Sequence, residues 1–134
     1  MIEVNVIKID SPFLDQKPGT SGLRKSTLQF QEDHYLEIFI ESILRSLENL
    51  EGSTLVVGGD GRYGNIEAIE KIVQICVAHK VQKVIIPKCG LLSTPATSHL
   101  IRKENAIGGI ILSASHNPGG IDGDFGVKLN ISNG

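Results

Sequence analysis

The chain has 134 residues, of which 40% are hydrophobic and 21% are charged, and this balance excludes a fully disordered protein. A length of this order suits one domain, so we expect a single domain over residues 1–134. The net charge of −2, without any run of basic residues, excludes generic electrostatic binding to nucleic acid or to an anionic membrane.

The cysteines and the ends of the chain indicate a compartment. Cys76 and Cys89 are too few for a disulfide framework, which favours a reducing environment. The N-terminus lacks the basic and apolar regions of a secretory signal, and no apolar run is long enough to span a membrane. We therefore expect a cytoplasmic protein.

Alternation and periodicity of apolar residues predict the elements in chain order. Residues 4–9 have strand character and, after a loop rich in Pro, Gly, Ser and Thr, so do residues 23–30. Apolar residues at the helical period predict a helix over 33–50. The remaining pattern predicts strand 54–57, helix 66–77, strand 84–86, a helix capped by Thr94 and ending near 103, strand 109–112 and an edge strand 126–131.

This order contains repeated β–α–β units, which form parallel strands covered by helices on both faces. The expected fold class is α/β, a three-layer αβα sandwich with a mixed, mostly parallel sheet. Ligands of such sheets bind at the carboxyl ends of the strands. Glycine-rich segments follow strands 54–57 and 109–112 at those ends, and glycines there indicate tight turns and close approaches of the backbone.

Two of the glycine-rich segments favour ordinary turns. Residues 59–64 (GDGRYG) match the G-x-G-x-x-G pattern of dinucleotide-binding turns, but no acidic residue follows at 79–88 to hold a ribose. A tight turn in which Asp60 and Arg62 bond locally is therefore favoured. Asp122 and Asp124 lack the further ligands of a calcium loop, which favours a solvated turn.

The segment 113–120 (SASHNPGG) places the hydroxyl of Ser115 beside His116 directly after a buried strand. On composition alone it is a turn, and Pro118 with Gly119 suits the centre of a type II turn. The functional alternative is a serine nucleophile at the ligand end of the sheet, with glycines that let a phosphate approach the backbone. Lys128 is close enough in the chain to return to the same edge.

The loop 17–25 is a second candidate for phosphate binding. Its backbone N–H groups, the hydroxyls of Thr20 and Ser21 and the guanidinium of Arg24 are the donors that a phosphate needs. Taken alone, this segment is an ordinary N-terminal loop.

Together these segments resemble the phosphoglucomutase branch of the α-D-phosphohexomutases. The matching stretches occur in the family's order and nearly span the chain: KPGTSGLR at 17–24, VGGDGR at 57–62, LSTP at 92–95, GGIIL at 108–112, ASHNPGG at 114–120, GDFG at 123–126, and Lys128 with NISNG at 130–134. The combination is specific although each piece is not. It makes the nucleophile the preferred interpretation of Ser115.

The resemblance implies domain I of a Mg²⁺-dependent enzyme that interconverts glucose 1-phosphate and glucose 6-phosphate, with glucose 1,6-bisphosphate as intermediate and activator. It implies a phosphoryl group on Ser115, with His116 and Lys128 as active-site residues beside it. It also implies a phosphate-binding loop with Thr20, Ser21 and Arg24. Mg²⁺ would bind Ser115 through its phosphate, and its aspartate ligands are expected in a later domain. The choice between His116 and Lys128 as the group that moves the proton stays open.

Departures from the family pattern leave alternatives. Ser113 stands where the family usually has Thr, and residues 121–122 replace the usual Pro-Asn. The family has further domains, so the expected partners are sugar phosphates and the remaining domains of the same enzyme, and residues 1–134 alone are expected to be inactive. The alternatives are a phosphomannomutase or phosphoglucosamine mutase, and a non-catalytic, mutase-like phosphoprotein module.

Overall fold

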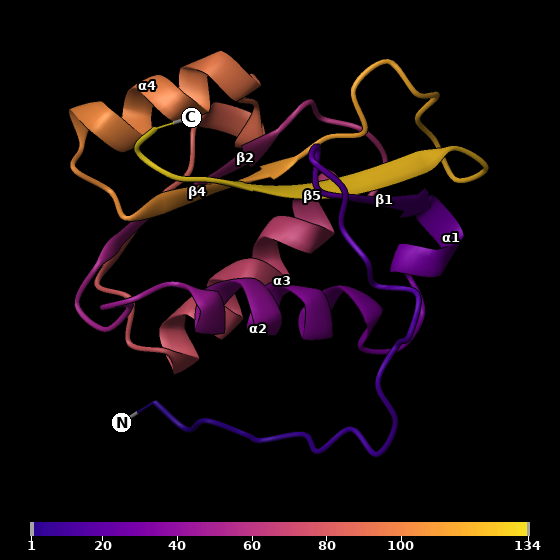
Figure 1. The fold of residues 1–134 in the computed structure, drawn as a ribbon, viewed down its shortest axis with the longest axis horizontal. Coiled ribbons are helices and arrows are strands. Elements are labelled where there is room, and N and C mark those ends of the chain that lie inside the picture. The colour runs from indigo at the N-terminus through magenta and orange to yellow at the C-terminus, as the bar shows by residue number, and fades with distance from the viewer. Residues whose placement is uncertain (1, 134) are drawn as a thin grey trace.

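The computed structural model describes residues 2–133 and contains a five-stranded sheet between two layers of helices (Figure 1). The strands are β1 (Leu23–Ser26), β2 (Thr54–Gly59), β3 (Lys83–Ile85), β4 (Gly108–Leu112) and β5 (Asp124–Asn130). The helices are α1 (Thr27–Phe30), α2 (Tyr35–Ser46), α3 (Asn65–Ala78) and α4 (Thr94–Lys103), with a short 3-10 helix, η1 (Lys88–Gly90). Over the described residues, none of the helices has the length and apolar character needed to cross a membrane.

The strands lie in the order β1-β5-β4-β2-β3. Strand β2 is parallel to β3 and β4, whereas β5 is antiparallel to both of its neighbours. All strands except β5 therefore run the same way, as predicted for a mixed, mostly parallel sheet. Helix α4 covers one face and α2 with α3 the other, which confirms the three-layer αβα sandwich (Figure 1).

The larger core lies between the sheet and the pair α2 and α3. The apolar residues that predicted α2 face this core, where Ile40 and Leu44 are fully buried. A smaller core under α4 contains Val56, Ile101 and Ala106. Strands β2 and β4 are buried on both faces, which explains their short, uninterrupted apolar sequences. Their carboxyl ends are consequently fixed by packing on two sides.

The strand predicted at residues 4–9 is wrong. This segment is an extended arm in which Val6 is 90% exposed, and residues 2–12 make no backbone hydrogen bond to any other described residue. Figure 1 shows the arm on the far side of α2 from the sheet. Its alternating sequence suits a strand, but a strand also needs a neighbouring edge, and none lies beside it.

Three further predictions are corrected: the end of β1, the place of β5 in the sheet and the N-cap of α4. The predicted strand 23–30 ends at Ser26 because its partner, β5, begins opposite that residue, and Ser26 then caps α1 by accepting a hydrogen bond from the N–H of Gln29 (3.2 Å). Strand β5 lies inside the sheet, since β1 occupies the edge predicted for it. Helix α4 is capped by Ser93 rather than by Thr94.

Candidate active site

The serine loop, residues 113–123, connects the carboxyl end of β4 to the start of β5. Ser115 is exposed and has a left-handed backbone (φ 57°), which costs an L-residue roughly 1–2 kcal/mol. The N–H of Asn117 donates to the carbonyl of Ala114 (3.1 Å), so Ser115 and His116 are the central residues of the turn. The type II turn predicted at Pro118 and Gly119 is wrong, because Gly119 does not have the positive φ that the second central position of such a turn requires. The serine instead stands at the tip of a tight turn.

Ser113 supports this turn through its side chain. Its hydroxyl accepts a hydrogen bond from the N–H of Ser115 (3.0 Å) and donates one to Oδ2 of Asp60 (2.9 Å). Asp60 is within reach because β2 and β4 are neighbouring strands, with Gly59 opposite Leu112. The hydroxyl of Ser113 is thus engaged both as a donor and as an acceptor. Of the two hydroxyls, that of Ser115 is the one more accessible to a reactant. A threonine at 113 carries the same hydroxyl, so this departure from the family pattern preserves the contact.

Asp60 is ionised in this environment. Partial burial raises the pKa of Asp60, but hydrogen bonds from Arg62 and Ser113 outweigh it, and the net pKa lies below its ordinary value of 3.8. The carboxylate therefore stays a strong acceptor for both neighbours at neutral pH.

This lowered pKa makes a prediction for acid stability. A carboxyl group with a lowered pKa in the folded state stabilises the fold above its unfolded-state pKa and loses that contribution as pH falls through the lower value. We expect Asp60→Asn to lose less stability than the parent protein between about pH 5 and pH 2, measured as urea midpoints. Asp122→Asn, in the exposed turn, is the matched control. An unchanged acid limb in Asp60→Asn would contradict the prediction.

The local pairing predicted for Asp60 and Arg62 is confirmed. The Nε and Nη2 atoms of Arg62 donate to the carboxylate of Asp60 at 2.8–3.1 Å. Arg62 also reaches the serine loop, where it donates to the carbonyl oxygens of Ser115 (3.1 Å) and Asp124 (2.7 Å). No local sequence pattern indicates this second role, because 53 residues separate Arg62 from Ser115.

The structure brings His116 to the serine. Its Nδ1 lies 3.5 Å from Oγ of Ser115, and both side chains are exposed. This separation is long for a hydrogen bond, but catalytic hydrogen bonds often shorten only when substrate binds. His116 is therefore placed to exchange a proton with the serine hydroxyl.

Arg24 and Lys128 share one face of the sheet. Leu23 and Val127 are buried in the larger core, so the alternation of strand side chains places Arg24 and Lys128 on the opposite face. Among residues 2–133, neither cation forms an ion pair with a carboxylate. Arg24 is exposed and Lys128 is half-buried, and two positive charges without a carboxylate partner are suited to a phosphate.

The loop with Thr20 and Ser21 lies beside Lys128. Gly19 and Gly22 exchange backbone hydrogen bonds and close a tight turn, and Gly22 packs so closely that an added Cβ would be 2.9 Å from Cα of Lys128. The predicted phosphate-binding residues are therefore brought together with this lysine. Lys128 is opposite Ile111, and Ser115 lies beyond the end of the same strand, so Lys128 is set back along the sheet from the serine.

Asp15 anchors the chain that leads into this loop, a role that the sequence analysis missed. Its Oδ2 accepts hydrogen bonds from the hydroxyl of Tyr35 and from Nε2 of Gln29, both at 2.6 Å. The hydrogen bond from Tyr35 holds the pKa of Asp15 below its ordinary value. Lys25 adds an ion pair at 3.4 Å. No pattern in the sequence links Asp15 to Tyr35, since the two residues are 20 positions apart.

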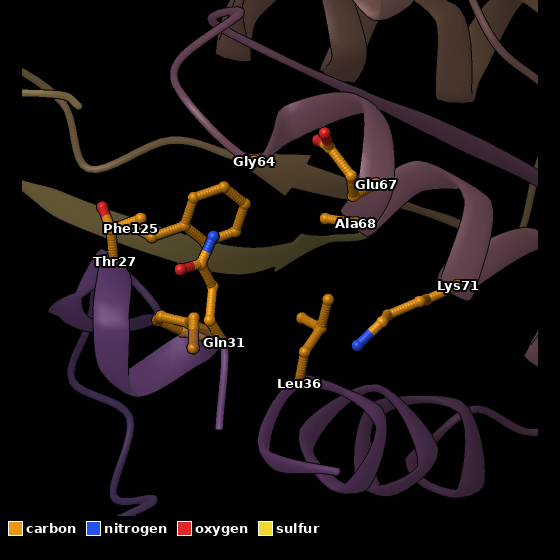
Figure 2. A pocket seen from close by; sticks show the side chains of 9 residues that line it. Thr27, Gln31, Leu36, Gly64, Glu67, Ala68, Lys71 and Phe125 are labelled. Carbon is orange, nitrogen blue, oxygen red and sulfur yellow. The ribbon is translucent and has the colours of Figure 1, made fainter. Parts of the chain in front are cut away.

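Two hollows lie near the serine loop, and Ser115 lines neither. A pocket of about 300 Å³ opens between α1, α2 and α3, on the face of the sheet opposite α4, with Phe125 and Leu36 among its lining residues (Figure 2). A shallower hollow of about 390 Å³ lies beside Asp60 and is lined by Leu91, Leu92 and Ser93. Ser115 itself is exposed at the surface.

Few side chains of the described residues are placed to bind a metal ion. Over residues 2–133, no three His, Cys, Asp or Glu side chains lie together as metal ligands. The carboxylate of Asp60 is already engaged by Arg62 and Ser113. A cation bound at the serine loop would therefore need ligands in addition to these side chains.

The architecture and the serine loop define a class of three-layer α/β domains that present a serine at the carboxyl edge of a mixed sheet. Residues 15–134 match the family model for the phosphoglucomutase/phosphomannomutase alpha/beta/alpha domain I. The chain therefore belongs to the phosphoglucomutase/phosphomannomutase family, as the sequence resemblance implied.

Individual relatives agree with the family match. The chain is 59% identical to a phosphoglucomutase of Aspergillus fumigatus over 92% of this chain and 22% of the relative. It is 53% identical to phosphoglucomutase-1 of Bos taurus over 100% of this chain and 24% of the relative. The open form of the exocytosis-sensitive phosphoprotein pp63/parafusin (phosphoglucomutase) from Paramecium superposes with a TM-score of 0.89 at 48% identity, over 93% of this chain and 24% of that structure. The chain thus spans about a quarter of the length of these relatives.

Proposed function

We propose that this chain is the nucleophile-bearing part of a phosphoglucomutase, which interconverts glucose 1-phosphate and glucose 6-phosphate through a phosphoryl group on Ser115. The observation that carries the proposal is the exposed Ser115 at the tip of its turn, beside a Ser113 hydroxyl that is already engaged. The identity of 59% and 53% to phosphoglucomutases supports glucose as the sugar.

The chemistry is two phosphoryl transfers in opposite directions. In the first, the 6-hydroxyl of glucose 1-phosphate attacks the phosphoserine, the bond from phosphorus to Oγ of Ser115 breaks, and glucose 1,6-bisphosphate forms. In the second, Oγ of Ser115 attacks the phosphoryl group at position 1, and glucose 6-phosphate leaves. Glucose 1,6-bisphosphate also acts as the activator that phosphorylates free serine.

The side chains supply a proton and positive charge. His116, with Nδ1 3.5 Å from Oγ, gives the departing serine oxygen a proton and takes it back in the second transfer. The proton that the 6-hydroxyl of the sugar loses in the first transfer is balanced by the one that the sugar oxygen at position 1 gains in the second. Arg24, Thr20 and Ser21 bind the phosphate oxygens, and Lys128 adds charge on the same face. A phosphoryl oxygen on Ser115 would hold Mg²⁺, which would supply further charge neutralisation, and the remaining metal ligands would come from outside this chain.

The remaining parts of the enzyme are partners of this chain. Since relatives are about four times as long, we propose that the residues which recognise the sugar and complete the metal site belong to other domains of the same protein. Residues 1–134 alone are then inactive. The enzyme works in the cytoplasm on soluble sugar phosphates.

Phosphorylation of the serine tests the proposal directly. We expect the full-length protein, incubated with glucose 1,6-bisphosphate, to gain one phosphoryl group by intact mass, and peptide mapping to place it on Ser115. The same sample should convert glucose 1-phosphate to glucose 6-phosphate. A phosphoryl group on another residue, or faster turnover of mannose 1-phosphate or glucosamine 1-phosphate, would contradict the assignment.

A second candidate function is a phosphoprotein module without turnover. It is favoured by the description of the Paramecium relative as an exocytosis-sensitive phosphoprotein. The same experiment separates the two functions, because a module of this kind would carry phosphate on Ser115 without converting glucose 1-phosphate.

A further inference from the structure

The guanidinium of Arg62 is nearly enclosed between the β2–α3 turn and the serine loop. Its side chain is 7% exposed, whereas the other arginine paired with a carboxylate, Arg45 on α2, is 74% exposed. A buried cation needs a charged partner and hydrogen bonds for its N–H groups. Asp60 supplies the charge, and the carbonyl oxygens of Ser115 and Asp124 accept the remaining bonds.

These two carbonyl groups lie at opposite ends of the serine loop. Nη2 donates to Ser115, near the start of the loop, and Nη1 donates to Asp124, where β5 begins. A guanidinium is planar, so its donors have a fixed separation. One rigid group from the β2–α3 turn therefore determines how far apart the two ends of the serine loop are held.

Asp60 and Arg62 together determine the backbone conformation of Ser115. The N–H of Ser115 is held by Ser113, which donates to Asp60, and the carbonyl of Ser115 is held by Arg62, which donates to Asp60 as well. Both peptide groups that flank the left-handed Ser115 are thus hydrogen-bonded to side chains that themselves bind the carboxylate of Asp60. Such a conformation persists only where neighbouring groups determine it.

From these contacts we infer that Arg62 is a positioning residue for the nucleophile: it holds the carbonyl of Ser115, and thereby directs Oγ and its phosphoryl group toward the sugar, without contacting either itself. This inference rests on the proposed function of Ser115. Asp60 compensates the charge of Arg62, whereas Arg24 and Lys128 form no ion pair with a carboxylate among residues 2–133.

Arg62→Ala in the full-length protein tests the inference. We expect kcat for glucose 1-phosphate to fall roughly 10- to 100-fold, because small misplacements of reacting groups have effects of this size, while KM changes little. Added guanidinium ion, at millimolar concentrations below those that unfold proteins, should restore part of the lost kcat by filling the enclosed space beside Asp60. The matched control, Arg45→Ala, should keep the parent kcat and show no response to guanidinium.

Arg62→Lys covers the case in which the alanine variant fails to fold. Its ammonium can pair with Asp60, but it lacks the planar set of donors that reaches both carbonyl groups, so kcat should stay well below the parent value. The rate at which glucose 1,6-bisphosphate phosphorylates Ser115, followed by intact mass on folded protein, should fall in parallel. A folded Arg62→Ala or Arg62→Lys variant with the parent kcat overturns the inference, and so does a reduced kcat of Arg62→Ala that guanidinium does not raise.

Ser115→Ala separates failure of this inference from failure of the proposed function. If Ser115→Ala is as active as the parent protein, the proposed function is wrong, whatever Arg62 does. If Ser115→Ala is inactive while the Arg62 variants keep the parent kcat, only the positioning role is wrong.

Discussion

Ser115→Ala is expected to lower the conversion of glucose 1-phosphate by the full-length protein by at least about 1000-fold, as loss of a nucleophile does in enzymes that depend on it. Alanine keeps the Cβ of serine, so the variant removes the hydroxyl and little else from the exposed turn. The neighbouring hydroxyl of Ser113 cannot replace it, because it donates to Asp60 and accepts from the N–H of residue 115. The measurement is the initial rate with glucose 1,6-bisphosphate present.

Two controls accompany this variant. Ser42→Ala removes an exposed hydroxyl that donates to Ile38 on α2, remote from the serine loop, and should keep the parent rate. Ser113→Thr retains the hydroxyl that contacts Asp60 and should remain active. Near-normal turnover by Ser115→Ala would refute the nucleophile, since no other described contact prepares a hydroxyl in the same place.

Gly126→Ala is expected to destabilise the protein by roughly 1–3 kcal/mol, the usual range for an overpacked interior. A Cβ at this position would overlap the carbonyl oxygen of Ser113 and come within 3.2 Å of Cγ of Arg24. The carbonyl oxygen of Gly126 also accepts a hydrogen bond from the N–H of Ser113 (2.9 Å). The obstruction is backbone, so relief requires β5 and the start of the serine loop to separate. The change should therefore lower kcat as well as the urea midpoint.

Gly19→Ala is the matched control for stability. An added Cβ there has no atom within 4 Å, and the backbone of Gly19 is outside the left-handed region, so its urea midpoint should stay close to the parent value. If Gly126→Ala shows the midpoint and the kcat of the parent, the close approach of β5 to Ser113 is not a constraint on the serine loop.

The elements that the sequence predicted correctly are those whose signal is local. The apolar period of Ile40 and Leu44 predicts α2, and the short apolar runs of β2 and β4 predict strands buried on two faces. Repeated β–α–β units then imply that the carboxyl ends of these strands share one edge. The turn at Ser115 was assigned to that edge for the same reason, and the structure confirms its position.

The predictions that failed depend on pairing between distant segments. Alternation at 4–9 says that a strand is possible there, but only a neighbouring edge makes one, and α2 stands between the arm and the sheet (Figure 1). The end of β1 at Ser26 is likewise set by where β5 begins. The edge position of β1 and its length both follow from that pairing and have no local signal.

The sequence by itself determined the fold class, the main helices and buried strands, and Ser115 as the residue to test, because periodicity and the ordered motifs are properties of the chain alone. Tertiary structure decided what holds that serine. Asp60 and Arg62 are 53 residues from the groups they contact in the serine loop, Ser113 for Asp60 and Ser115 for Arg62. Asp60 and Arg62 contact the serine loop because the sheet order places β2 beside β4. That order is a result of long-range packing rather than of any local pattern.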